Sequence, residues 1–246
     1  MTKLVVQFSL IIFLLFNQLV YANEMQYVCG VSDGFPPYQY KSKQGQVEGF
    51  DADVMRLMAD TMGAELRFYQ SNWDDVVSSF VHTNKLDCVI GMEITEVRRR
   101  YFDFTIAYYD RVSAVFVLSK NTQINRFTDL IGKKVAGDRH SDLEQYLELK
   151  GLGRLIRLRQ TDSKEASMKL LKSGDVLAVI APKEVGLYLA QSLNMAVTII
   201  EELNQVSPVG IAVKKGNTKT LNAFNEAINI LNHSGQIEAL YRQRFD

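Results

Sequence analysis

Short apolar runs alternate along the first part of the chain with longer segments in which apolar residues recur every three or four positions. The short runs have the composition of buried strands, and the longer segments have the period of amphipathic helices. In the segment 49–63, Val54 and Met58 fall on one face, and Gly63 ends the pattern as glycine often does at a helix C-terminus. The predicted elements are, in order, strand 26–31, helix 49–63, strand 64–70, helix 72–84 and strand 86–92.

The same alternation restarts after residue 113 and continues to the end of the chain. Strongly apolar strands separated by helices favour a parallel sheet that helices cover on both faces. A strand and two helices are left over after the second set, so we expect the chain to return to the first set and two strands to cross between the sets. The predicted elements are strands 114–119, 133–137, 155–160, 176–181, 196–202 and 209–215, and helices 141–151, 163–174, 184–194, 218–235 and 236–246.

This organisation predicts an α/β protein of two lobes joined by a two-strand hinge. We expect residues 23–110 and 206–246 to form lobe 1 and residues 111–205 to form lobe 2. Ligands of open α/β sheets bind at the carboxyl ends of the strands, so the cleft between the lobes is the expected ligand site.

The N-terminal segment differs from the rest of the chain. Lys3 precedes an apolar run, residues 4–16, that only a glutamine and a serine interrupt, and small or apolar residues lead up to Ala22. This run is shorter than the roughly 20 apolar residues that a membrane span needs. The pattern predicts a secretory signal peptide of residues 1–22, cleaved after Ala22, rather than a membrane anchor. No cysteine follows the apolar run directly, which argues against a lipid-anchored form.

Composition changes this picture little. The 246 residues carry 28 basic and 28 acidic side chains, so net charge gives no reason to expect nucleic acid or an anionic membrane as a partner. Cys29 and Cys88 both lie in predicted strands, where they are either small buried side chains or the two halves of a disulfide, which an exported protein can form. Two cysteines and three widely spaced histidines make a poor metal site, and we expect no metal and no cofactor.

One motif suggests a hydrolase. Residues 30–34 (GVSDG) match the G-x-S-x-G pattern of a nucleophile elbow, in which the serine lies at a tight turn from a strand into a helix. Here Pro36 and Pro37 follow at once and disfavour a helix. Ser32 is therefore predicted to end the first strand and not to act as a nucleophile.

The segment 91–104 (GMEITEVRRRYFDF) is more informative. Thr95 is a good N-cap, and Glu96 would lie in the first helical turn. Arg98 then falls at the third helical position, where a guanidinium beside free backbone N–H groups is an apt receptor for a carboxylate. The alternative is a solvated helix face, which must hold for at least one of the three consecutive arginines.

These segments resemble family 3 of the extracellular solute-binding proteins, the polar amino-acid receptors of ABC importers. The similarity covers residues 49–68, the stretch from Trp73 to Tyr109, and residues 210–245, and so nearly the whole mature chain. It implies the type II periplasmic binding protein fold, a periplasmic location, and an amino acid or related carboxylate as ligand. It further implies an inner-membrane ABC permease as partner and a monomer without catalytic residues.

The resemblance also implies a ligand site in lobe 1. Arg98 corresponds to the arginine that binds the ligand α-carboxylate, and Gly91 to a residue whose backbone groups contact the ligand. Phe35, in the turn of residues 34–37, corresponds to an aromatic residue that covers the ligand side chain. Trp73 corresponds to its partner on the opposite wall.

Lobe 2 contributes a second set, and two positions depart from the family pattern. Ser141 and Asp142 correspond to the helix N-terminus that holds the ligand carboxylate from the other side. Pro182 stands where the family has an aspartate for the ligand ammonium, and Glu93 stands where it has a small hydroxyl residue that also touches the ammonium. A buried ammonium without a counter-charge is unfavourable, so we expect Glu93 to replace the missing aspartate.

Three alternatives stay open at the level of sequence. In the first alternative, Glu93 pairs with Arg98 and the ligand is not a standard α-amino acid. The protein is an enzyme similar to the cyclohexadienyl dehydratases of the same superfamily, with Glu93 or Glu184 as the acid that protonates a leaving hydroxyl. The chain is the sensor domain of a receptor, which is disfavoured because the sequence to Asp246 has no membrane span after its N-terminal segment and no output domain.

Overall fold

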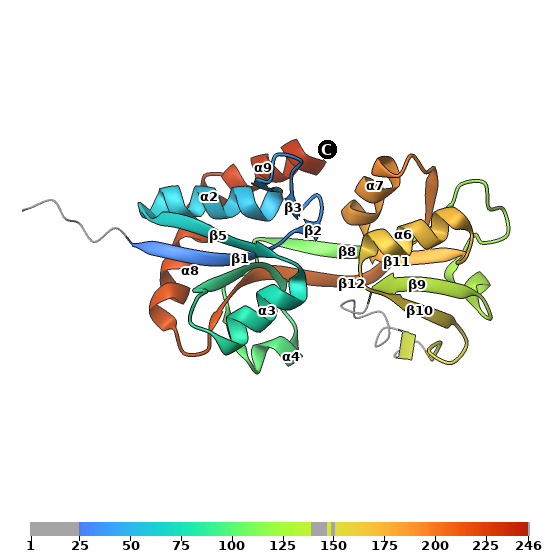
Figure 1. The fold of residues 1–246 in the computed structure, drawn as a ribbon, viewed down its shortest axis with the longest axis horizontal. Coiled ribbons are helices and arrows are strands. Elements are labelled where there is room, and N and C mark those ends of the chain that lie inside the picture. The colour runs from blue at the N-terminus through green and yellow to red at the C-terminus, as the bar shows by residue number, and fades with distance from the viewer. Residues whose placement is uncertain (1–24, 139–146, 149–150, 246) are drawn as a thin grey trace, which may run out of the picture.

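The computed structural model describes residues 25–138, 147–148 and 151–245 (Figure 1). The predicted signal peptide, residues 1–22, and most of the predicted helix 141–151 lie outside these residues. Within the described ranges, no helix combines the length and the apolar content needed to cross a membrane.

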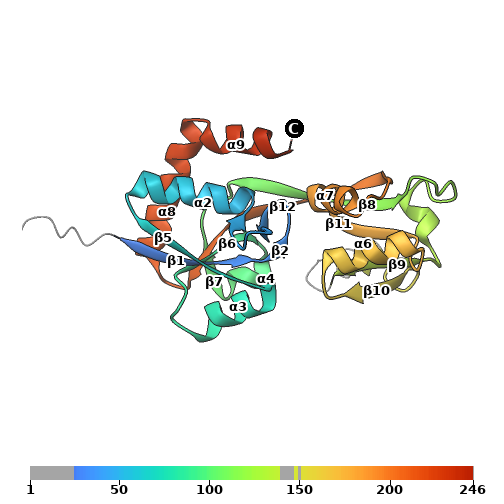
Figure 2. The same cartoon turned by 45° about the horizontal axis from the view of Figure 1, so that its top comes forward.

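One mixed sheet runs through the molecule. Its strands lie in the order β10 (Arg157–Thr161), β9 (Lys134–Asp138), β11 (Ala178–Pro182), β8 (Tyr109–Leu118), β12 (Val197–Lys214), β6 (Cys88–Glu93), β1 (Gln26–Ser32) and β5 (Glu65–Ser71), and β7 (Phe102–Phe104) pairs with β12. The two central strands, β8 (Tyr109–Leu118) and β12 (Val197–Lys214), pass between two groups of elements, which we call lobe 1 and lobe 2 (Figures 1 and 2). The predicted architecture, two α/β lobes joined by two crossing strands, is confirmed.

Lobe 1 is built on β1, which pairs in parallel with β5 on one side and with β6 on the other. A small antiparallel sheet of β2, β3 and β4 lies beside it. The lobe-1 elements are strands β1 (Gln26–Ser32), β2 (Gly34–Phe35), β3 (Gln39–Lys41), β4 (Val47–Glu48), β5 (Glu65–Ser71), β6 (Cys88–Glu93) and β7 (Phe102–Phe104), and helices α2 (Phe50–Met62), α3 (Trp73–His82), α4 (Glu96–Arg99), α8 (Thr218–His233) and α9 (Gln236–Phe245).

Helix α2 illustrates why these segments fold as predicted. Val54 and Met58 are fully buried in the lobe-1 core, so the apolar stripe read from the sequence faces inward. Gly63 follows the helix in the left-handed conformation, with φ of 59°, and its N–H donates to the carbonyl of Asp60.

Lobe 2 is built on β9, which pairs in parallel with β10 and with β11. Helices α6 and α7 pack against this part of the sheet. The lobe-2 elements are strands β9 (Lys134–Asp138), β10 (Arg157–Thr161) and β11 (Ala178–Pro182), helices α6 (Lys164–Ser173) and α7 (Lys183–Ser192), and the 3₁₀ turn η1 (Phe127–Leu130).

The crossing strands correct two predictions. The separate strands expected at 196–202 and 209–215 are one strand, β12, and the sheet is not parallel throughout, because β12 runs antiparallel to β6, β7 and β8. The apolar pattern stops after Leu203, but the backbone ladder with β8 continues at Val206, Ser207 and Pro208. The expected lobe boundaries, at 110/111 and 205/206, fall inside β8 and β12.

The two cysteines form a disulfide. Cys29 and Cys88 lie directly opposite each other in the β1–β6 pair, with their Cα atoms 4.6 Å apart. That separation is within the range that a disulfide spans. Of the two possibilities that the sequence left open for the cysteines, the disulfide is therefore the one present. It joins β1 to β6 three residues before each strand reaches the site.

Candidate ligand-binding site

A cavity of about 310 Å³ lies between the lobes, at the carboxyl ends of β1, β6 and β9. Five residues predicted for the ligand site line it together: Phe35, Trp73, Gly91, Glu93 and Arg98. Ser141 and Asp142, the predicted contacts from lobe 2, lie outside the described residues. Among the residues of lobe 2 that the structure describes, Asp138, Asp162, Ser163 and Lys164 line the cavity.

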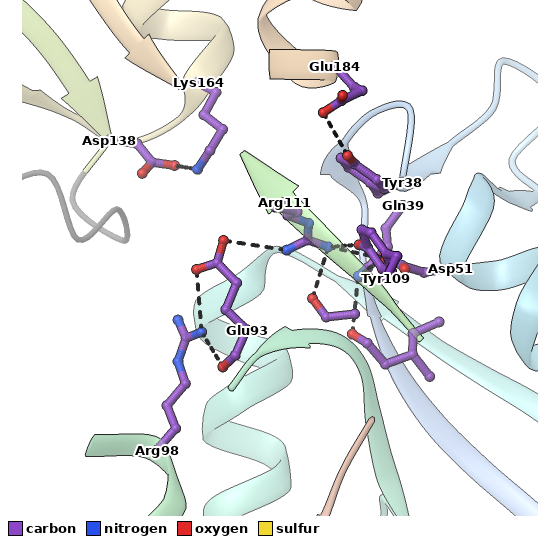
Figure 3. A network of polar contacts seen from close by, with 12 residues as sticks. Tyr38, Gln39, Asp51, Glu93, Arg98, Tyr109, Arg111, Asp138, Lys164 and Glu184 are labelled. Atoms are coloured by element: carbon purple, nitrogen blue, oxygen red, sulfur yellow. Dashed lines mark hydrogen bonds and ion pairs between the residues drawn. The ribbon is translucent and has the colours of Figure 1, made fainter. Parts of the chain in front are cut away.

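Arg98 reaches the cavity from the short helix α4. As predicted, the Thr95 side chain caps this helix and accepts from the Arg98 backbone N–H at 3.2 Å. The Arg98 side chain is about a quarter exposed, and its Nη1 donates to the Glu93 carbonyl at 3.0 Å. Nη1 is also 3.8 Å from Glu93 Oε2, so the side chain is held at the wall of the cavity (Figure 3).

Glu93 lies between two guanidinium groups. Its Oε2 is 3.8 Å from Arg98 Nη1, and its Oε1 is 3.8 Å from Arg111 Nη1 (Figure 3). The ion pair between Glu93 and Arg98, the first part of one alternative read from the sequence, is therefore present, and the second part, a ligand that is not a standard α-amino acid, stays a prediction. Both distances exceed the range of a hydrogen bond, so the two carboxylate oxygens keep their capacity to accept from a ligand.

Arg111, on the crossing strand β8, is the main site residue that the sequence did not indicate. Its guanidinium is buried and lines the cavity. Nη2 donates to the Gly91 carbonyl at 3.1 Å and lies 3.3 Å from Asp51 Oδ2, while Cζ lies 4.7 Å from the ring centre of Phe35. Burial lowers the pKa of Arg111, but the neighbouring Tyr109, Asp51 and Glu93 raise it by more than burial lowers it. The net shift of the pKa is upward, so the side chain is cationic.

Asp51 is the fully buried counter-charge of Arg111. Burial raises the pKa of its carboxyl, and Arg111 and hydrogen bonds oppose that rise. The bonds come from the Tyr108 hydroxyl at 2.6 Å and Gln39 Nε2 at 2.7 Å. The backbone of Gly91 lies close to Asp51 and Gln39 and has φ of +63°. A Cβ at this position would lie 2.0 Å from both the Asp51 carboxylate and the Gln39 amide, so only glycine fits.

Side chains of lobe 2 meet lobe 1 around the cavity. Lys164, the first residue of α6, forms an ion pair with Asp138 at the end of β9 (Figure 3). The Lys164 Nζ also lies 5.0 Å from the ring centre of Phe35. Glu184, one of the two candidate acids, accepts a hydrogen bond at 2.9 Å from the Tyr38 hydroxyl of lobe 1. These contacts join the two walls.

The region around Ser32 differs in detail from the prediction. Ser32 does end β1, and its Oγ accepts from the Gly34 N–H at 3.3 Å. No helix follows, which agrees with the rejection of a nucleophile elbow. Gly34 and Phe35 form the short strand β2, which pairs with β3, and the turn itself runs from Phe35 to Tyr38, where the Tyr38 N–H donates to the Phe35 carbonyl at 3.1 Å.

A signal for Arg111 was present in the sequence but ambiguous. In residues 109–118 (YDRVSAVFVL), Asp110 and Arg111 precede an apolar run, and charged residues in this position indicate an end of the strand or a functional site. Gln39 and Asp51 gave no comparable signal, because a glutamine in a loop and an aspartate in a first helical turn are ordinary.

Two lobes that share a crossing-strand hinge, with a cavity lined from both, define a periplasmic binding protein fold. The sequence model of the bacterial extracellular solute-binding proteins, family 3, matches residues 27–246. The chain belongs to this family, as its motifs indicated.

Characterised relatives of the chain bind different amino acids. The L-cystine-binding protein TcyJ of Escherichia coli is 25% identical over 218 residues, which cover 88% of this chain and 81% of TcyJ. An L-arginine-binding protein of Pseudomonas aeruginosa is 29% identical over 227 residues, which cover 88% of this chain and 86% of that protein.

Solved structures extend the range of related proteins. An ancestral arginine-binding protein bound to arginine is 32% identical, with a TM-score of 0.79, and covers 90% of this chain and 98% of its own. A histidine kinase sensor domain with similarity to periplasmic binding proteins is 25% identical, with a TM-score of 0.81 over 90% of this chain and 96% of its own. An ancestral amino acid-binding protein, AncCDT-1, a precursor of cyclohexadienyl dehydratase, is 26% identical, with a TM-score of 0.79 over 90% of this chain and 95% of its own.

Proposed function

We propose that this protein is a periplasmic substrate-binding protein of an ABC importer, which binds an amino acid or a close relative and delivers it to an inner-membrane permease. Support comes from its family and from relatives named for binding cystine and arginine. The proposal includes export with cleavage of residues 1–22.

The observation that carries the proposal is the pair formed by Arg98 and Glu93. An α-amino acid bears a carboxylate and an ammonium on one carbon atom, so its receptor needs a cation and an anion close together. Arg98 Nη1 and Glu93 Oε2 are 3.8 Å apart, and both residues line the cavity. In the proposed complex, the ligand carboxylate binds Arg98, the ligand ammonium binds Glu93, and Arg111 holds Glu93 in place.

The remaining predicted contacts complete the site. Phe35 and Trp73 contact the ligand side chain, and Gly91 shapes the wall behind it. Ser141 and Asp142 stay predictions for the carboxylate from lobe 2. Pro182 ends β11 and offers no charge for the ammonium, and the proposal gives that role to Glu93 because it lies beside Arg98.

Delivery requires the lobes to open and close about the crossing strands β8 and β12. A ligand that contacts both lobes stabilises the closed state by its additional contacts there. The hydrogen bond from Tyr38 to Glu184 and the contact of Lys164 with Phe35 join the lobes in the same region. They would break on opening and re-form on closure.

The role of Glu93 is tested by Glu93→Gln. We first identify the ligand by mass spectrometry of small molecules released from the purified, denatured protein. Calorimetry then compares the amino acid with its deaminated analogue. If Glu93 binds the ammonium, Glu93→Gln weakens binding of the amino acid by at least about tenfold, the scale of one charge-assisted hydrogen bond. Binding of the deaminated analogue should weaken much less. Glu96→Gln, in the exposed first turn of α4, is the matched control. Equal losses for both ligands would contradict the proposal.

A dehydratase is the second candidate, because the carboxyl group of Glu93 lines the cavity and that of Glu184 accepts a hydrogen bond from the Tyr38 hydroxyl of the other lobe. A general acid must be protonated when it acts. Incubation of the protein with prephenate or arogenate, followed by chromatography, tests for turnover. Turnover that Glu184→Gln or Glu93→Gln abolishes would establish the enzyme, and its absence supports the receptor.

A further inference from the structure

The amino ends of β9 and β10 lie at the opposite end of lobe 2 from the cavity, which is near their carboxyl ends (Figure 1). Backbone hydrogen bonds join the segments that lead into the two strands. The Gly132 N–H donates to the Leu155 carbonyl at 2.7 Å, and the Arg157 N–H donates to the Lys133 carbonyl at 2.9 Å. Arg157 is paired with Lys134 across the two strands, so both side chains leave the same face of the sheet. We call this surface the lobe-2 tip, and its members are all exposed: the basic residues Lys133, Lys134, Arg154, Arg157 and Arg159, and the apolar residues Ile131 and Leu155.

The lobe-2 tip carries a local excess of positive charge. Within the described part of the chain, none of its five basic side chains forms an ion pair. Three acidic residues border it, and one of them, Asp129, is already paired with Arg126. The other two are Glu148 and Asp175, and both are exposed. The whole chain has 28 basic and 28 acidic side chains, so five cations beside two available acids are an asymmetry of this surface and not of the protein.

The two apolar members of the lobe-2 tip decide which kind of anionic partner fits. Ile131 is 46% exposed and Leu155 is 47% exposed, and the Gly132–Leu155 hydrogen bond holds their segments together beside the cations. Clustered basic residues attract anionic lipid headgroups, and apolar side chains next to them enter the boundary between headgroups and acyl chains. A bilayer presents many mobile anions and needs no shaped pocket, which matches a surface whose seven side chains are all exposed. An acidic protein surface would pair with the cations but gives no such reason for the two apolar residues.

We propose that the lobe-2 tip binds the surface of an anionic phospholipid bilayer, with its cations on the headgroup phosphates and with Ile131 and Leu155 in the headgroup boundary. The tip and the cavity lie at opposite ends of β9, so the bound protein keeps its cavity free of the bilayer. Membrane binding and ligand binding should therefore be independent of each other. The proposal goes beyond the receptor function and does not depend on which amino acid the cavity takes.

Sedimentation of the mature protein with lipid vesicles tests the proposal. At about 0.15 M salt, the protein should bind vesicles that contain phosphatidylglycerol at least about tenfold more tightly than vesicles of phosphatidylcholine alone, and higher salt should weaken this binding. Each basic residue near an anionic leaflet strengthens binding by roughly fivefold, so Lys134→Gln with Arg157→Gln should weaken it by at least about tenfold. The matched control is Lys169→Gln with Arg242→Gln, which removes the same charge from two exposed helical ion pairs outside the tip. It should change binding by less than about threefold.

Each outcome supports or overturns the bilayer as the partner. Equal binding to the two kinds of vesicle, or none to either, would overturn it, and so would equal losses in the tip variant and the control. Recovery of the tip variant's binding partner as a membrane protein, without binding of the wild type to pure lipid, would assign the surface to an acidic protein instead. Urea midpoints of both variants should match that of the wild type, because the substituted side chains are exposed, so unfolding would not explain a loss of vesicle binding. A negative result leaves the amino-acid receptor standing, since calorimetry of the cavity tests that function separately.

Discussion

Replacing Arg111 with methionine should destabilise the protein, because it leaves Asp51 buried without its counter-charge. The Arg111 side chain is 5% exposed and that of Asp51 is fully buried, with Nη2 and Oδ2 3.3 Å apart. Loss of one member of a buried ion pair typically costs 3–5 kcal/mol. Hydrogen bonds from Tyr108 and Gln39 to Asp51 remain, so we expect the lower end, roughly 3 kcal/mol.

The loss should depend on pH in a defined direction. Burial already raises the pKa of Asp51, and Arg111 opposes that rise, so the pKa of Asp51 in Arg111→Met is higher still. A carboxyl whose pKa is raised in the folded state stabilises that state when it is protonated, and this stabilisation is lost as pH rises through the folded pKa. The difference between wild type and Arg111→Met should therefore be largest at neutral pH and shrink as the pH falls.

Urea denaturation followed by circular dichroism measures both effects. Arg67→Met is the control, because Arg67 is a strand arginine in an exposed ion pair with Glu65. The double variant tests whether the two residues interact. Asp51→Asn should lower the free energy of unfolding less in the Arg111→Met background than in the wild type, by more than about 1 kcal/mol, because substitutions of contacting residues are not additive. A loss below about 1 kcal/mol for Arg111→Met, or strict additivity with Asp51→Asn, would refute the buried pair.

Three further outcomes follow from the site and the fold. Arg98→Ala should weaken ligand binding by at least about 2 kcal/mol in calorimetry, whereas Arg99→Ala should change it little, and the reverse order would refute the assignment. Ligand addition should change the fluorescence of Trp73, the single tryptophan of the chain, and no change with a verified ligand would exclude it from the site. Replacing Cys29 and Cys88 with alanine should lower stability by roughly 2–4 kcal/mol in urea titrations, since the bridge joins residues 59 positions apart, and an unchanged midpoint would contradict this.

Elements whose signals are local could be predicted from the sequence. Helix α2 follows from an apolar stripe closed by Gly63, and α4 follows from the capping residue Thr95. Because the cap fixes where α4 begins, it also fixes that Arg98, rather than Arg99, turns toward Glu93. These features depend on residues at most a few turns apart. The family resemblance then predicted a role for Arg98 in binding the ligand.

Features that depend on residues far apart could not be predicted. Asp51 and Arg111 are 60 positions apart, and each alone is compatible with an exposed position. The continuity of β12 through polar residues depends on its pairing with β8, which the apolar pattern does not record. The Cys29–Cys88 bridge depends on the register of two parallel strands, which sequence spacing leaves undetermined.

The buried arginine also bears on where the hinge bends. Arg111 ties the start of β8 to lobe 1 through Asp51 and the Gly91 carbonyl, so this end of the strand moves with lobe 1. Just beyond it, the ladder between β8 and β12 is irregular from Glu202 to Val206, where fewer backbone hydrogen bonds resist bending. We therefore expect the hinge to bend most easily immediately after Arg111, and we expect the guanidinium to keep its contacts with Asp51 and Gly91 when the lobes open.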